Sequence, residues 1–261
     1  MANRRIGGIL FGAANRSARR LATRPFRAWM EALPRQRRFG ALLRLARTVA
    51  PLAPRRGLGL ILHNRSPLES TRDIVFVQLL ALLNRYQIPF DPEVTVEGIE
   101  CLDEAVAAGR GVLLAGPHTH VTILTTIRHL HDSGYPLSAV TLGAFERPAG
   151  KKSAIHEIPH NPHFLLAVRD ALNEGRTVFA MIDRYTAVPG TVPVETCGGT
   201  VHVADALFRL AARCGARVVF VATRTERDRV SCTLGAPPPD GTSEDYMGAF
   251  AGFIQAYARR A

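Results

Sequence analysis

Short apolar runs rich in β-branched residues alternate with longer segments of helical periodicity, and this alternation constrains the fold more than any other feature. The runs "GVLLAG", "LSAVTLG", "TVFAMID" and "ARVVFVATRTE" are each typical of a buried strand. The segments between them are long enough and periodic enough to predict helices. Strands that alternate with helices in this way predict an α/β fold with a mixed, largely parallel sheet sandwiched by helices.

The helical segments can be placed from their periodicity and their capping residues. We expect helices over residues 66–87, 101–110, 121–134, 161–175, 201–215 and 243–260, the last capped by Ser243. A short alternating strand is expected over residues 93–100. We expect two histidines on the outer part of a helix and three in a loop broken by prolines: His129 and His131, then His156, His160 and His163.

The charge of the chain is divided very unevenly. The 261 residues carry a formal net charge of +11. Residues 1–56 contain 14 arginines, no lysine and one acidic residue, Glu31, which gives +13; the other 205 residues carry 19 basic and 21 acidic groups, about −2. We therefore expect a basic N-terminal arm over residues 1–56 and one globular α/β domain over residues 57–261.

Apolar residues recur among the arginines of this arm at helix-like spacing. They are Ile9, Leu10, Phe11, Phe26, Trp29, Met30, Leu33, Phe39, Leu42 and Leu43. Such an amphipathic pattern predicts a helix at a membrane interface, with arginines on anionic lipids, whereas a nucleic-acid tail needs no apolar face. A solvated arm without a partner is the alternative. No run approaches the roughly 18 apolar residues of a spanning helix, and the early arginines disfavour a signal peptide.

Cysteine usage points to no metal or disulfide framework. Cys101, Cys197, Cys214 and Cys232 are widely scattered along the chain, without the paired spacing of a zinc site. Free thiols in a reducing cytoplasm are therefore expected.

Polar residues follow two of the predicted strands at the point where each ends. His118 and His120 follow "GVLLAG", and Asp183 and Arg184 follow "TVFAMI". In open parallel sheets ligands bind beyond the carboxyl ends of the strands. The sequence therefore predicts a site at this edge of the sheet.

Three segments in order resemble the lysophospholipid acyltransferase superfamily, most closely its lipid A biosynthesis (lauroyl/myristoyl) branch from Gram-negative bacteria. They are "VEGIECLDEAVAAGRGVLLAGPH", "LNEGRTVFAMIDRY" and "GGTVHVADALFRLAARCGARVVFVATR". The resemblance covers about residues 60–225. It implies a glycerol-3-phosphate acyltransferase-like fold and acyl transfer from an acyl carrier protein or acyl-CoA thioester to a hydroxyl of a lipid or glycolipid. It also implies no cofactor and a peripheral location on the cytoplasmic face of the inner membrane.

The resemblance makes His118 the general base that takes a proton from the acceptor hydroxyl. The family places a carboxylate five positions after this histidine, to orient and stabilise the imidazole. Here that position is Ile123, and counting from His120 leads to Thr125. Either His120 or Asp183 would have to replace the missing acid, or the protein no longer transfers acyl chains.

The resemblance also implies residues that hold the acceptor. Arg147 of "GAFER" matches the block whose arginine holds a phosphate, and Asp183–Arg184 would lie beside it. Gly199 and Thr200 would present backbone N–H groups to an anion ahead of a helix beginning near His202. The alternatives are a solvated loop arginine, an ion pair at a strand end and a tight turn.

Two other functions fit the same residues. His118 and His120, completed by Asp183, match the two-imidazole site of a metal-dependent hydrolase. A catalytically impaired acyltransferase-like protein that binds lipid or carrier would fit Ile123. The expected partners are an acyl carrier protein or coenzyme A thioester and anionic membrane lipids, and no nucleic acid.

Overall fold

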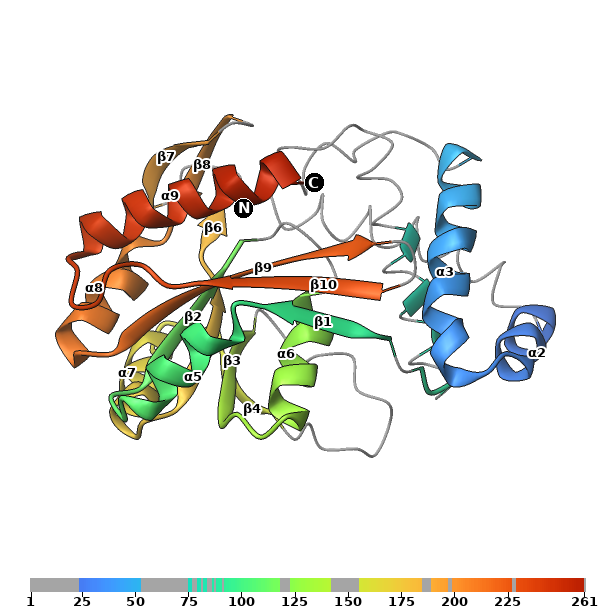
Figure 1. Ribbon diagram of the computed structural model, residues 1–261, viewed down its shortest axis with the longest axis horizontal. Coiled ribbons are helices and arrows are strands. Elements are labelled where there is room, and N and C mark those ends of the chain that lie inside the picture. Colours follow the sequence, from blue (N-terminus) through green and yellow to red (C-terminus); the bar gives the residue numbers. More distant parts are fainter. Residues whose placement is uncertain are drawn as a thin grey trace.

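A seven-stranded mixed sheet forms the centre of the molecule (Figure 1). In spatial order its strands are β1 (Val94–Glu97), β10 (Arg229–Gly235), β9 (Arg217–Glu226), β2 (Val112–Gly116), β5 (Thr177–Met181), β3 (Leu137–Thr141) and β4 (His156–Pro159). Only the β9–β10 pair is antiparallel among these neighbours. The computed structural model describes residues 24–52, 75–76, 79–80, 82–83, 86, 88–90, 92–117, 123–141, 155–184, 189–196, 199–226 and 229–260.

Helices cover both faces of this sheet, which confirms the predicted α/β fold. One layer contains α7 (Phe164–Asn173), α8 (Asp205–Cys214) and α9 (Ser243–Arg260), and the other contains α5 (Ile99–Ala107) and α6 (Ile123–Asp132). Along β2, Leu113 packs into the first layer and Leu114 into the second. Every residue of β2 is buried because the strand is covered on both sides.

The strand expected over residues 93–100 ends sooner than predicted. Gly98 takes a left-handed conformation (φ 77°), which ends β1 at Glu97 and starts α5 at Ile99. A Cβ at Gly98 would lie 2.6 Å from the carbonyl oxygen of Leu234, so a glycine is required here. The helix predicted to begin at residue 101 therefore starts two residues earlier.

The helix predicted over residues 201–215 was wrong at its start, because the first of these residues belong to a second, antiparallel sheet. It consists of β6 (Asp183–Arg184), β8 (Gly199–Val203) and β7 (Val192–Thr196). Residues 201–203 lie in β8, and α8 begins only at Asp205. The alternating Val-His-Val segment is β-branched on either side of His202, so it pairs as a strand and does not continue the helical periodicity.

Two strands of the main sheet were not predicted. His156 lies in β4, which pairs in parallel with β3, so its assignment to a loop was wrong. His160 and His163 follow the strand and are exposed, as expected. β10 alternates inward Val230, Cys232 and Leu234 with partly polar positions and closes an antiparallel hairpin with β9.

The cap of α9 is Thr242, so the prediction of Ser243 was wrong. The backbone N–H of Thr242 donates to Asp245 Oδ2 (2.8 Å), and the Asp245 N–H donates to Thr242 Oγ1 (3.2 Å). This reciprocal pair is a capping box. The bonds donated by Thr242 lower the pKa of the Asp245 carboxyl. The Ser243 hydroxyl donates to the Asp205 carboxylate at the start of α8.

The basic N-terminal region packs onto the domain through α2 (Arg24–Ala32), α3 (Arg35–Val49) and the short 3₁₀ helix η1 (Ala50–Leu52). Met30, Phe39 and Leu42 are completely buried. They pack with apolar residues that include Phe76, Leu83 and Val230. These side chains were expected to face lipid, and that expectation is wrong because the protein itself covers them. Residues 1–23 and the predicted boundary at residue 56 lie outside the described residues.

Arg38 fixes the turn between α2 and α3. Its buried guanidinium donates to the carbonyl oxygens of Leu33 (2.9 Å), Glu31 (3.1 Å) and Pro89 (2.6 Å). Glu31 belongs to the last turn of α2, Leu33 directly follows that helix, and Pro89 belongs to the segment before β1. One side chain therefore holds three parts of the chain together.

The described part of the chain contains no helix that is both long and apolar enough to span a lipid bilayer.

Candidate functional site

Parallel strands β2, β5 and β3 end at one edge of the main sheet, where the predicted site residues follow. Gly116, the last residue of β2, is in register with Met181 of β5. The Ile182 N–H donates to the Gly116 carbonyl (3.0 Å), and the Ile182 carbonyl accepts from Ala204 N–H (2.7 Å). The chain that leaves β5 is therefore held between the end of β2 and the residue that precedes α8.

The end of β2 is packed so closely that a side chain there would press on its neighbours. A Cβ at Gly116 would lie 3.0 Å from the Val221 carbonyl oxygen, 3.1 Å from Val221 Cγ1 and 3.3 Å from Phe179 Cε2. Glycine thus allows β2, β5 and β9 to approach one another where the chain continues toward His118. The buried Pro117 is the last described residue before that position.

Asp183 lies at this edge of the sheet, where the sequence predicted it, and its carboxylate is buried. It is the first residue of β6, and its side chain is 8% exposed. It pairs with Val203 of β8, and directly paired residues in an antiparallel ladder share a face of the sheet. Val203 is fully buried in the core beneath α7, α8 and α9, so Asp183 lies on the inward face.

Other predicted site residues fall outside the described residues, or are described only in their backbone. His118, His120 and Arg147 lie outside the described residues. The backbone of Arg184 pairs with His202 of β8. His202 occupies the face of β8 opposite Val203 and is half-buried.

Gly199 and Thr200 do not form the anion site ahead of a helix that the sequence predicted. Both lie in β8, where they pair with Thr196 and Glu195 of β7. At about 3.3 Å per residue, Thr200 lies roughly 16 Å along the chain from the start of α8 at Asp205. The same spacing separates it by about 10 Å from Val203, the partner of Asp183. The prediction failed because these residues belong to a hairpin and not to a helix-opening turn.

The position of the missing family acid is part of the hydrophobic core. Ile123 is the first residue of α6 and is only 3% exposed. It packs with apolar residues of α5 and the sheet that include Leu102 and Leu114. Thr125, the position counted from His120, is half-buried in the same helix. A carboxylate at 123 would be surrounded by aliphatic groups, which favours the neutral acid.

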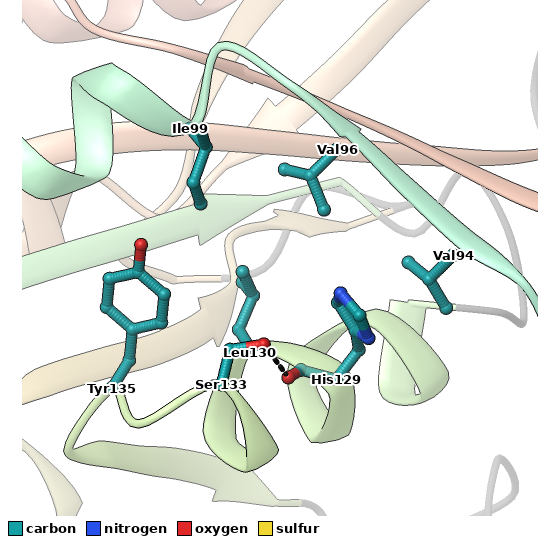
Figure 2. Close-up of a pocket in the computed structure, with 7 residues that line it drawn as sticks. All are labelled: Val94, Val96, Ile99, His129, Leu130, Ser133 and Tyr135. Carbon is teal, nitrogen blue, oxygen red and sulfur yellow. Dashed lines mark hydrogen bonds between the residues drawn. The ribbon is translucent and has the colours of Figure 1, made fainter.

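A pocket of about 240 Å³ lies between α6 and β1 (Figure 2). Its lining combines aliphatic and polar side chains: Val94, Val96, Ile99, His129, Leu130, Ser133 and Tyr135. None of the predicted site residues lines it. His129 was expected to be exposed, but it is half-buried and points into this pocket, and His131 is half-buried as well. No motif in the sequence predicts this pocket, because the pairing of β1 with β10 is what brings β1 alongside α6.

Tyr135 at one end of the pocket is held by Asp103 of α5. Its hydroxyl donates to Asp103 Oδ1 (2.6 Å). Burial, followed by this hydrogen bond and the charge of Asp103, raises the pKa of Tyr135 to about 12. The phenol therefore remains a neutral hydrogen-bond donor at physiological pH.

We expect the protein to lose stability in alkali through Cys232. Burial, and then the charge of Glu97, raises the pKa of this thiol from its ordinary 9.0 to about 12. Because the folded pKa is the higher one, the stabilisation is fully present below pH 9 and is lost as pH rises toward 12. Three pKa units correspond to at most about 4 kcal/mol. Urea unfolding at a series of pH values measures the loss. Cys232→Ala should make the free energy of unfolding fall less steeply as the pH rises from 9 to 12. An unchanged slope of the free energy of unfolding against pH would contradict this account.

Among the described residues, no group of three or more His, Cys, Asp and Glu side chains is arranged to hold a metal ion. The two histidines of the predicted metal alternative lie outside those residues. Cys101, Cys214 and Cys232 are free thiols, and Cys197 lies outside the described residues.

Comparison of the sequence with models of known protein families finds no match, and comparison with curated proteins finds no significant relative. The resemblance to the lysophospholipid acyltransferase superfamily therefore rests on the motifs themselves.

Proposed function

We propose that the protein transfers a fatty acyl chain from an acyl carrier protein or acyl-CoA thioester to a hydroxyl of a lipid or glycolipid. His118 takes the proton of the acceptor hydroxyl, and the oxygen attacks the thioester carbonyl carbon. The carbon–sulfur bond then breaks, and the proton passes from the imidazolium to the departing thiolate. No covalent acyl-enzyme and no cofactor are required.

The observation that carries this proposal is the hydrogen bond between Ile182 N–H and the Gly116 carbonyl. It joins the ends of two neighbouring strands, one leading to His118 and the other to the buried Asp183. Consecutive Cα atoms are about 3.8 Å apart, so His118 and Asp183 each lie within one or two residues of this bond. This closeness supports Asp183 as a replacement for the family carboxylate, able to orient the imidazole and stabilise its charged form.

A catalytically impaired lipid- or carrier-binding protein is the second candidate, and the burial of Ile123 favours it. The family has a carboxylate at this position. Here the position holds Ile123, whose side chain packs in the hydrophobic core and cannot orient the imidazole. Under this alternative the fold would bind an acyl group or carrier without transferring the chain. The two candidates differ in a single measurable property, the turnover of a thioester.

The test compares wild-type protein with His118→Ala in a thioester assay. Acyl-CoA and acyl carrier protein donors are supplied with a total lipid extract, and acylated products are identified by mass spectrometry. Loss of a general base should lower the rate by about 10²- to 10⁴-fold. Equal rates for wild type and variant, including no turnover by either, would reject the enzyme proposal and favour the binding candidate. Stoichiometric zinc in the purified protein would instead favour the metal-dependent alternative.

A further inference from the structure

The two hydroxyl groups that line the pocket between α6 and β1 have no hydrogen left for a ligand (Figure 2). The Tyr135 hydroxyl donates to Asp103 Oδ1 (2.6 Å), and the Ser133 hydroxyl donates to the carbonyl oxygen of His129 (2.9 Å). Carboxylate and carbonyl oxygens only accept, so both hydroxyl hydrogens are committed. Each hydroxyl oxygen can still accept a hydrogen bond through its lone pairs. The pocket therefore favours a ligand that donates.

Tyr135 is the stronger of these two acceptors. Its hydrogen bond to a charged carboxylate polarises the hydroxyl and increases the negative charge on Oη. A positively charged donor gains most from such an oxygen, because the charge of Asp103 lies directly behind it. The Tyr135–Asp103 pair thus favours a cationic donor over a neutral one.

The elements around the pocket are acidic, although the protein as a whole is basic. Together, β1, α5, α6 and residues 133–135 contain five acidic residues and one basic residue, a net charge of −4 in a chain of +11. The acidic residues are Glu97, Glu100, Asp103, Glu104 and Asp132. The basic residue, Arg128, lies 3.7 Å from the carboxylate of Asp132. The local charge therefore attracts a cation and repels an anion.

Apart from His129, the rest of the lining is aliphatic. Figure 2 shows Leu130 between His129 and Tyr135, facing Val96 and Ile99 across the pocket. A volume of about 240 Å³ holds a short alkyl chain, since native packing fills about three quarters of the available space. The His129 imidazole can accept or donate a hydrogen bond, so it is compatible with a donor ligand.

We propose that this pocket binds a primary alkylammonium group. The N–H groups of the cation would donate to Tyr135 Oη and Ser133 Oγ, and its alkyl chain would lie against the aliphatic side chains. A carboxylate would instead meet two accepting oxygens and an acidic surface. An alcohol would fit the same space but would gain less from the charge of Asp103. None of the predicted site residues lines the pocket, so the proposal does not depend on acyl transfer.

The test titrates the full chain with hexylamine, hexanol and hexanoate and follows the protein amide signals by NMR. A ligand of this size should bind with a Kd of roughly 0.1 to 1 mM. We expect hexylamine to bind about tenfold more tightly than hexanol, with shifts centred on His129, Leu130 and Ser133, and hexanoate to bind least. From propylamine to hexylamine, each buried methylene should tighten binding about fourfold until the pocket is full.

Asp103→Asn separates the charge from the shape of the pocket. The asparagine carbonyl still accepts from the Tyr135 hydroxyl, but the negative charge is lost. The variant should bind hexylamine about five- to tenfold less tightly than wild type and hexanol equally well. Tyr135→Phe removes the accepting oxygen itself, so it should weaken the binding of both ligands.

Matched controls lie in the helical layer on the other face of the sheet. Asp170 of α7 is an exposed carboxylate paired with Arg169 (2.7 Å), and the Tyr257 hydroxyl of α9 donates to the Thr223 carbonyl (2.6 Å). Asp170→Asn and Tyr257→Phe should leave the affinity for hexylamine unchanged. Tyr257→Phe loses a tyrosine hydrogen bond as Tyr135→Phe does, so it shows whether lost stability alone weakens binding.

A capped lysine, Nα-acetyl-lysine amide, identifies the source of the ammonium group. Tighter binding of the capped lysine than of butylamine would indicate a protein side chain, and the reverse a small free amine; either result supports an ammonium site. Hexanol binding as tightly as hexylamine would overturn the proposal and indicate a pocket for hydrocarbon. Tighter binding of hexanoate, an unchanged preference for the amine in Asp103→Asn, or no shifts up to about 10 mM hexylamine would also overturn it.

Discussion

Replacing Asp183 by asparagine is expected to slow acyl transfer by roughly 10²- to 10⁴-fold while leaving the protein folded. Asparagine keeps the size of the side chain but cannot stabilise an imidazolium, and exchanging the orienting carboxylate of a catalytic triad has effects up to this size. The loss should fall mainly on kcat, because Asp183 acts through the base and not through substrate binding. Steady-state kinetics with a saturating thioester donor measure the effect.

The pH profile separates this role from a purely structural one. A nearby carboxylate raises the pKa of a histidine, so its removal should move the acidic limb of the rate profile to lower pH. Asp205→Asn is the matched control, because Asp205 is also 8% exposed, but its carboxylate accepts a hydrogen bond from Ser243 and pairs with Arg209. It should lower stability and leave the profile in place. An Asp183→Asn enzyme with a wild-type rate would mean that another residue orients the base.

Gly111→Ala is expected to destabilise the fold by about 2 to 5 kcal/mol. Gly111 precedes β2 with φ 73°, a conformation that disfavours any side chain. A Cβ there would overlap the carbonyl oxygen of Leu172 and lie 2.9 Å from its carbonyl carbon. Leu172 is part of α7, so the added methyl group would force α7 away from the start of β2. Chemical denaturation gives the change in the free energy of unfolding.

Gly109 provides the comparison, since it has the same kind of backbone and no such neighbour. Its φ is 68°, and a Cβ would meet nothing within 4 Å. Gly109→Ala should therefore show only the conformational penalty of about 1 to 2 kcal/mol. If the two variants lose the same stability, the contact between Gly111 and Leu172 is not what requires glycine.

The strands buried on both faces were predictable from sequence, whereas β4, β7, β8 and β10 were not. β2 and β5 are continuous apolar runs because helices cover each side, and such runs are recognised without knowledge of their partners. β4 has four residues, of which only Ile158 is buried, so its sequence carries little signal. From sequence alone, Val201 and Val203 are compatible with a helix or a strand. Only the pairing with β7 shows that they form a strand.

Among the candidate site residues, the sequence predicted correctly the position of those that follow directly from the order of the parallel strands. Asp183 reaches the carboxyl edge because parallel neighbours end together, which is a property of the sheet and not of the local motif. Gly199 and Thr200 were assigned from a local glycine pattern, and the hairpin places them elsewhere. The pocket beside His129 depends on β1, whose position is set by β10, and no short segment of sequence contains that pairing.

The pairing of β1 with β10 also determines when the fold can be completed. Val94 is in register with Val230, so residues far apart in the chain must meet before the edge of the main sheet can form. Helix α3 packs against Val230 as well. On the ribosome, the N-terminal third therefore emerges long before its partner strand has been synthesised. Such non-local pairing slows folding and leaves apolar surface uncovered in the nascent chain until β10 has been synthesised.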